Sequence, residues 1–226
     1  MHFVLLGASG RTGQKVVSEL LSQGHTAVAL VRSAKSVAAR PGLTIITGSP
    51  LSRSDVHAAL SAVPNTPPSA AIFTLNTVRT SDSPFAAQVS PPRFLADSCA
   101  NACEVLAQAG VTRIVVMSTA GAGDSWANLP LLSKAFLGWT NVKHALEDHN
   151  ILDQEIRRTK MNWTLVRPVR LDFDKEDIGK GDVRTLGSDG RGMRMSDSVT
   201  VPAVARFLVR LATEGLFVRE SIVVTE

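Results

Sequence analysis

The stretch Phe3-Val4-Leu5-Leu6-Gly7-Ala8-Ser9-Gly10-Arg11-Thr12-Gly13 decides the fold of this chain. It joins a short apolar run, typical of a buried strand, to a loop whose glycines recur every third residue. Apolar residues at helical spacing follow, namely Val16, Val17, Leu20 and Leu21. This order predicts a strand, a glycine-rich turn and a helix, which is the arrangement that holds the pyrophosphate of a dinucleotide.

Each glycine of the loop has a separate expected role. Gly7 allows the chain to leave the strand in a conformation closed to other residues. Gly10 leaves room for the pyrophosphate, and Gly13 lets the helix pack closely on the strand. The spacing is G-x-x-G-x-x-G, not the usual G-x-G-x-x-G, so a purely structural turn is the alternative. The predicted cofactor-binding residues of the loop are Gly7, Ser9, Gly10, Arg11, Thr12 and Gly13.

The end of the second predicted strand, over 26–31, indicates which dinucleotide is bound. An acidic residue that binds the ribose 2′-hydroxyl usually follows this strand, but Arg32-Ser33-Ala34-Lys35 follows it here. Arg32 and Lys35, together with Arg11, offer cations to a 2′-phosphate, for which guanidinium groups are well suited. A solvated basic loop is the alternative. We therefore predict NADP(H), not NAD(H), as the cofactor.

Composition excludes several classes of protein. A chain of 226 residues that is 44% hydrophobic and 19% charged is ordinary for one globular domain. The net charge of +4 is scattered, and no basic run alternates with aromatic residues, so no nucleic-acid partner is expected. No stretch approaches the ~20 apolar residues of a membrane span. The first apolar run is too short for a signal peptide. We expect a cytoplasmic protein with a small-molecule substrate and no membrane partner.

Predicted strands and helices alternate along the remaining sequence. Strands are expected at 43–47, 70–75, 111–117, 163–166 and 221–224, with a short one near 183–186, and helices at 54–60, 95–109, 142–158 and 200–212. This order favours an α/β fold, a doubly wound parallel sheet of Rossmann type, in a single domain over 1–226. Irregular substrate-site loops are expected near 119–140 and 169–192. Cys99 and Cys103 should be small buried residues, and no metal-ligand spacing occurs.

The motifs together resemble the atypical short-chain dehydrogenase/reductases. Within these the chain is most similar to the NmrA-like group, and especially to its flavin reductase/biliverdin reductase B branch. The resemblance lies in the glycine loop, Val31-Arg32, the Gly48 turn, Asp148-His149, Ser118, Arg167-Pro168 and the segment 189–192. It implies a Rossmann-like fold and a nicotinamide cofactor.

The departures from that family concern catalysis. The family commonly uses Tyr-x-x-x-Lys as its acid, and this chain contains no tyrosine. His149 and Asp153 stand where such a pair might lie, and an aspartate in place of the lysine removes its cation. Ser49 and Val169 also replace an aspartate and a histidine of the family.

Five residues should lie where ligands bind, at the carboxyl ends of the strands; they are Asn76, Ser118, Thr119, Arg167 and Arg170. Asn76 and Ser118 are predicted to contact the cofactor. Ser118 is also a candidate catalytic residue that orients a substrate carbonyl, or else a hydroxyl that satisfies local backbone.

His149, with an ordinary pKa near ~6.5, is the second catalytic candidate, as a proton donor. The alternative is an exposed helical residue beside Asp153. Trp126 and Trp139 could wall a pocket for a flat substrate, or pack in the core or a lid.

These features predict an NADPH-dependent oxidoreductase. It would reduce a planar conjugated or aromatic small molecule by direct hydride transfer, without a Tyr-x-x-x-Lys acid. The alternative is a non-redox protein that binds NADP(H), either an isomerase or rearrangement catalyst or a redox-sensing regulator of NmrA type.

Overall fold

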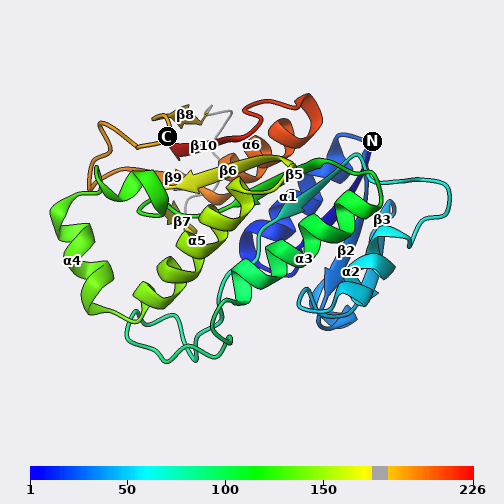
Figure 1. Cartoon of the computed structure of the whole chain (residues 1–226), viewed down its shortest axis with the longest axis horizontal. Coiled ribbons are helices and arrows are strands. Elements are labelled where there is room, and N and C mark those ends of the chain that lie inside the picture. Colours follow the sequence, from blue (N-terminus) through cyan, green and yellow to red (C-terminus); the bar gives the residue numbers. More distant parts are fainter. Residues whose placement is uncertain (175–182) are drawn as a thin grey trace.

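A mainly parallel sheet forms the middle layer of the molecule, as Figure 1 shows. The computed structural model describes residues 1–174 and 183–226, so part of the predicted loop 169–192 lies outside the described residues. The strand order is β3-β2-β1-β4-β5-β6-β10-β8. The strands in that order are Leu43–Thr47, Thr26–Val31, His2–Leu6, Ala70–Phe73, Arg113–Met117, Asn162–Pro168, Glu220–Thr225 and Arg184–Thr185.

All neighbouring strands from β3 to β10 pair in parallel, and β8 pairs antiparallel with β10. The chain moves outward from β1 to β2 and β3, then returns to β4 on the other side of β1. This reversal between β1 and β4 is the position at which ligands bind in doubly wound folds. The predicted fold class is therefore confirmed.

Helices cover both faces of the sheet. On one face α1 (Arg11–Ser22) packs against α6 (Val201–Glu214), and on the other α3 (Phe94–Gln108) packs against α2 (Arg53–Leu60) and α5 (Val142–Arg157). The two hydrophobic cores follow the alternation of the strands. Phe3 and Leu5 of β1 belong to the α1–α6 core, while Val4 and Leu6 belong to the α3–α5 core. Strands covered on both faces are apolar throughout, which explains the continuous apolar runs in the sequence.

The segment 119–140 differs from the expected irregular loop. It contains a 3₁₀ turn, η2 (Gly123–Trp126), and a helix, α4 (Leu131–Trp139), which packs on α5 outside the three layers. A second 3₁₀ turn, η1 (Ala34–Ser36), follows β2, and a small sheet pairs β7 (Arg170–Asp172) with β9 (Ser198–Thr200). Neither the second sheet nor α4 was predicted. Within the described ranges, no helix has both the length and the apolar character needed to cross a bilayer.

The two cysteines are buried and free on α3, as expected. The hydrogen bond to Cys103 and the burial of the thiol raise the pKa of Cys99 well above its usual value. A thiol held neutral is a poor nucleophile, so these residues serve packing.

Candidate functional site

The backbone conformation of the glycine loop confirms two of its expected structural roles. Gly7 has a φ of 100°, and a Cβ there would lie 2.6 Å from the backbone carbon of Thr74. A Cβ on Gly13 would overlap the Gly7 carbonyl oxygen and lie 2.8 Å from the Cα of Ala8. Larger residues at these two positions would push β1, β4 and α1 apart.

Gly10 differs because its side-chain position is open. It is exposed, and among the described residues a Cβ there would meet only the Gly7 carbonyl oxygen, at 3.3 Å. Within residues 1–174 and 183–226 no side chain caps the start of α1 at Gly10, and the first turn holds no acidic residue. An uncapped helix N-terminus beside open space fits a phosphate group, which would meet free N–H groups and the positive end of the helix dipole.

Arg32 and Lys35 are exposed just beyond β2, whose Leu30 pairs in register with Leu6 at the end of β1. They therefore follow the strand that neighbours the glycine loop. Arg11 contacts other groups. Its guanidinium lies 3.6 Å from an Asp82 carboxylate oxygen and 3.8 Å from the centre of the Phe173 ring. These contacts do not place Arg11 relative to Arg32 and Lys35, so a joint role of the three cations at the 2′-phosphate stays a prediction.

Arg11 also lines a hollow that adjoins a second cavity. The lining of the hollow includes Arg11, Asn76, Arg79 and Asp82, together with Val142 and Ala145 of α5. Asn76, Val142 and Ala145 also line the second cavity. The two spaces thus adjoin at Asn76, which follows β4, and at these two residues of α5.

The second cavity lies at the carboxyl ends of β4, β5 and β6 and has a volume of about 140 Å³. Most of its described lining is apolar, and Asn76, Ser118, Thr119 and His149 supply its polar side chains. The apolar lining is Leu75, Met117, Ala120, Leu137, Val142, Ala145, Leu146, Pro168, Val169 and Leu171. A mostly apolar cleft with a few polar groups is typical of a small-molecule site.

Ser118 and His149 meet in this cavity. The backbone N–H of Ser118 donates to the Val166 carbonyl at 2.6 Å, which fixes the residue at the end of β5. Its Oγ lies 3.4 Å from Nδ1 of His149, and both side chains are buried. The structure thus brings together the two residues proposed for catalysis.

Burial changes what His149 can do. The alternative of an exposed helical residue is wrong, because His149 is only 5% exposed. Desolvation lowers the pKa of His149 to about 4, and the nearby charge of Asp153 only partly opposes that change. The imidazole is therefore neutral at pH 7, which corrects the expectation of a protonated donor with an ordinary pKa.

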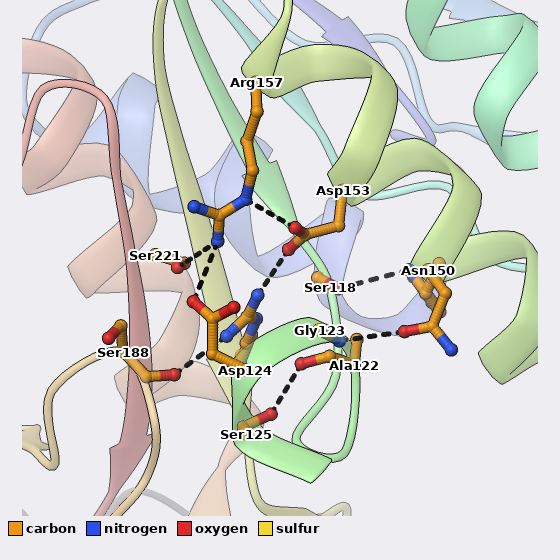
Figure 2. A network of polar contacts seen from close by, with 12 residues as sticks. Ser118, Ala122, Gly123, Asp124, Ser125, Asn150, Asp153, Arg157, Ser188 and Ser221 are labelled. Atoms are coloured by element: carbon orange, nitrogen blue, oxygen red, sulfur yellow. Dashed lines mark hydrogen bonds and ion pairs between the residues drawn. The ribbon is translucent and has the colours of Figure 1, made fainter. Parts of the chain in front are cut away.

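The carboxylate of Asp153 forms ion pairs with two arginines, of which Figure 2 labels Arg157. It accepts from Nε of Arg157 at 2.6 Å and from Nη2 of Arg167. Arg167 is fully buried and also donates to the Ser188 carbonyl at 2.8 Å. Arg167 therefore joins α5 to β6. It was expected among the residues that bind ligands, but it is absent from the described lining of the cavity. The exposed Arg170 is also outside that lining.

Asp148 is a functional group that sequence reasoning did not assign. Its carboxylate accepts the backbone N–H groups of Leu95 at 2.8 Å and Ala96 at 3.0 Å, so a residue of α5 caps α3. Burial raises the pKa of Asp148, and the two backbone hydrogen bonds oppose that rise. An aspartate in mid-helix gives no local signal of such a role, because its partners are some fifty residues earlier in the chain.

Neither candidate tryptophan lines the cavity among the described residues. Trp139 is 84% exposed and Trp126 is 40% exposed. Leu137, on the inner side of α4, contributes to the wall in their place. The expectation of a tryptophan-walled pocket is thus corrected, although α4 does border the cavity.

Comparisons with known proteins agree with this geometry. A family model described as NAD(P)H-binding matches residues 7–215. A search of curated proteins finds no match. Among solved structures, ChuY, an anaerobilin reductase from Escherichia coli O157:H7, is 19% identical with a TM-score of 0.76, over 99% of this chain and 96% of that one.

A short-chain dehydrogenase/reductase from Veillonella parvula, solved in complex with NADP, is likewise 19% identical, with a TM-score of 0.75 over 100% of this chain and 94% of that one. An oxidoreductase from Lactococcus lactis is 16% identical, with a TM-score of 0.73 over 99% and 90%. At these identities the structural matches establish a shared fold.

Proposed function

This chain belongs to the NAD(P)H-binding family, and from that premise we propose that it is an NADPH-dependent oxidoreductase. Its substrate is a planar, conjugated or aromatic small molecule, reduced by direct hydride transfer. The observation that carries the proposal is the junction at Asn76, where the hollow beside the glycine loop meets an apolar cavity. The nicotinamide of a cofactor held along the glycine loop would lie beside the apolar cavity, where an apolar acceptor fits.

Different residues of the chain hold different parts of the cofactor. The open space at Gly10 and the start of α1 take the pyrophosphate, and Arg32 and Lys35 take the 2′-phosphate. The cofactor supplies the hydride, so the protein needs chiefly to position the cofactor and the acceptor. The apolar walls favour an acceptor without charge at its buried end.

Ser118 orients the acceptor in this proposal. In the tautomer in which neutral His149 donates from Nδ1 to Ser118 Oγ, the serine proton is free to bond an acceptor oxygen. His149 then fixes the serine hydroxyl and carries no charge itself. The proton that completes the reduction comes from solvent, which is compatible with a chain that lacks tyrosine.

The proposal is tested by following NADPH absorbance with a panel of flavins, quinones and enones. We expect consumption of NADPH with at least one class, and much slower consumption with NADH. Replacing Ser118 with alanine should slow the reaction by less than the 10²–10⁴-fold, roughly, that an essential general acid supplies. Tight NADPH binding without consumption by any acceptor would favour the alternative, a non-redox protein that binds the nucleotide as an isomerase or a redox-sensing regulator.

A further inference from the structure

The buried end of the cavity combines a pair of polar side chains with apolar walls. Ser118 and His149 are both buried there, and Ser118 Oγ lies 3.4 Å from Nδ1 of His149. The other buried residues of the described lining are apolar, namely Met117, Ala120, Leu146, Pro168 and Val169. A ligand that fills this end therefore finds a hydrogen-bonding group at one point and apolar contacts around it.

The outer end of the cavity faces the space assigned to the cofactor. Its lining includes Asn76, Leu137, Val142 and Ala145, which are exposed or half-buried. Asn76, Val142 and Ala145 also line the hollow beside the glycine loop. A nicotinamide that enters from the hollow therefore lies at the outer end, and the acceptor occupies the space between the nicotinamide and Ser118.

The volume of the cavity limits the size of the acceptor. The cavity measures about 140 Å³. An apolar cavity of about 150 Å³ holds one benzene molecule, whereas pockets for drug-sized ligands measure roughly 300–1,000 Å³. The adjoining hollow measures about 260 Å³, but the bound cofactor occupies it. A single six-membered ring therefore fills the cavity, and fused rings exceed it.

The wall formed by Leu137 and Leu146 is supported from behind. A Cβ on Gly121 would lie 3.5 Å from Cδ1 of Leu137 and 3.8 Å from Cδ1 of Leu146, so both leucines pack against this glycine. The backbone N–H of Gly121 donates to Ser125 Oγ at 2.9 Å, and both residues are buried. Because the backbone at Gly121 is held in place, this wall cannot retreat to admit a larger ligand.

We propose that the acceptor is a single uncharged ring with a conjugated carbonyl group, such as a cyclic enone or a monocyclic quinone, and that the cavity excludes fused-ring acceptors such as flavins. This inference rests on the proposed reductase function and narrows its substrate class. The carbonyl oxygen accepts from Ser118 Oγ at the buried end. No charged side chain occurs in the described lining, so an anionic ring would find no partner there.

The reduction of a cyclic enone balances without a further reactant. The enone gains a hydride from NADPH at its β-carbon, and the electron pair of its C=C bond moves toward the carbonyl oxygen that Ser118 holds. A solvent proton at the α-carbon then gives the saturated ketone, with NADP⁺ as the other product.

The test is calorimetric binding to the full chain saturated with NADP⁺, a complex in which no reduction occurs. The probes are 2-cyclohexen-1-one with one ring, 1,4-naphthoquinone with two and riboflavin with three. We expect affinity to fall at least roughly tenfold from one ring to two, with no detectable binding of riboflavin. Benzaldehyde should bind and benzoate should not. Riboflavin binding as tight as that of the one-ring probes, or no binding of either uncharged one-ring probe, would overturn the proposal.

A variant with a larger cavity tests the size limit directly. Leu137→Ala should raise the affinity for 1,4-naphthoquinone by roughly tenfold. Leu132→Ala is the matched control, because Leu132 lies on the same helix but is 66% exposed and outside the described lining; it should bind as wild type. Val142→Ala enlarges the outer end from α5 and keeps the test valid if Leu137→Ala does not fold. Unchanged naphthoquinone binding in both enlarged variants would contradict exclusion by size.

NADPH consumption separates this inference from the reductase function. Consumption with riboflavin but not with 2-cyclohexen-1-one would overturn the one-ring acceptor and leave the reductase function standing. Consumption with no acceptor would refute the reductase function and the reduction of the ring, whereas the order of affinities for the NADP⁺ complex would still support a one-ring ligand.

Discussion

The three glycines of the first loop differ in what a side chain would meet. Gly10→Val places its branched side chain in the open space assigned to the pyrophosphate, so NADPH binding should be lost while the fold survives. Gly13→Ala should instead lower the free energy of unfolding, because its Cβ overlaps the Gly7 carbonyl. NADPH titration and thermal unfolding of both variants check this. A Gly10→Val protein that binds NADPH normally would show that the loop is only a structural turn.

Arg32 decides cofactor preference in this account. Arg32→Ala should weaken NADPH binding by about 1.5–3 kcal/mol, the value of a charged hydrogen bond to phosphate, and leave NADH binding nearly unchanged. Titration of both cofactors against wild type and variant measures the difference. Equal affinity of the wild type for NADPH and NADH would contradict the assignment.

His149 should make stability depend on pH. Its pKa is about 4 in the folded protein and near ~6.5 when unfolded, so between these values the unfolded chain binds the extra proton. Stability is therefore lost as pH falls from about 6.5 to 4, by about 3 kcal/mol in total. In His149→Gln this contribution should disappear, whereas the control His144→Gln, at an exposed position, should behave as wild type. Identical pH profiles of urea unfolding for all three proteins would refute the buried neutral imidazole.

Between elements, the pairing of Asp153 with Arg167 links α5 to β6. Asp153→Asn leaves the fully buried Arg167 without a charge partner, and breaking a buried pair in this way costs about 3–5 kcal/mol. The matched control is Asp124→Asn, because Asp124 is about half exposed and pairs with Arg157 at 3.2 Å; it should cost about 1 kcal/mol or less. Denaturant unfolding compares them, and equal losses would contradict a structural role for the buried pair.

The elements that local patterns specify were predictable from the sequence. The first strand, the glycine turn and α1 follow from apolar spacing and from glycine positions, and each of these signals lies within the segment itself. α4 was missed because it is short and its large apolar side chains are exposed, whereas the pattern of a surface helix assumes that the apolar face is turned toward the core. The roles of Asp148 and Arg167 were missed because their partners lie far along the chain, and only the folded topology brings them together.

At the scale of the whole molecule, the fold places a cofactor loop and an acceptor cavity on the same edge of one sheet. β1 leads into the glycine loop, while β4, β5 and β6 are followed by Asn76, Ser118 and Val169, which line the cavity. Because the strand order reverses between β1 and β4, the glycine loop lies next to the ends of β4, β5 and β6. The hollow beside the loop therefore adjoins the cavity. The sequence indicated each strand end separately, but the junction at Asn76 and the neutral state of His149 depend on the packing of α5 across these ends.

We expect the nicotinamide ring of bound NADPH to reach the cavity beside Ser118. A crystal structure with bound NADPH tests it most directly. We expect the pyrophosphate over Gly10, the 2′-phosphate beside Arg32 and Lys35, and C4 of the nicotinamide facing the space between Ser118, Leu137 and Val169. A nicotinamide directed away from that cavity, or one whose C4 is covered by protein, would contradict the account.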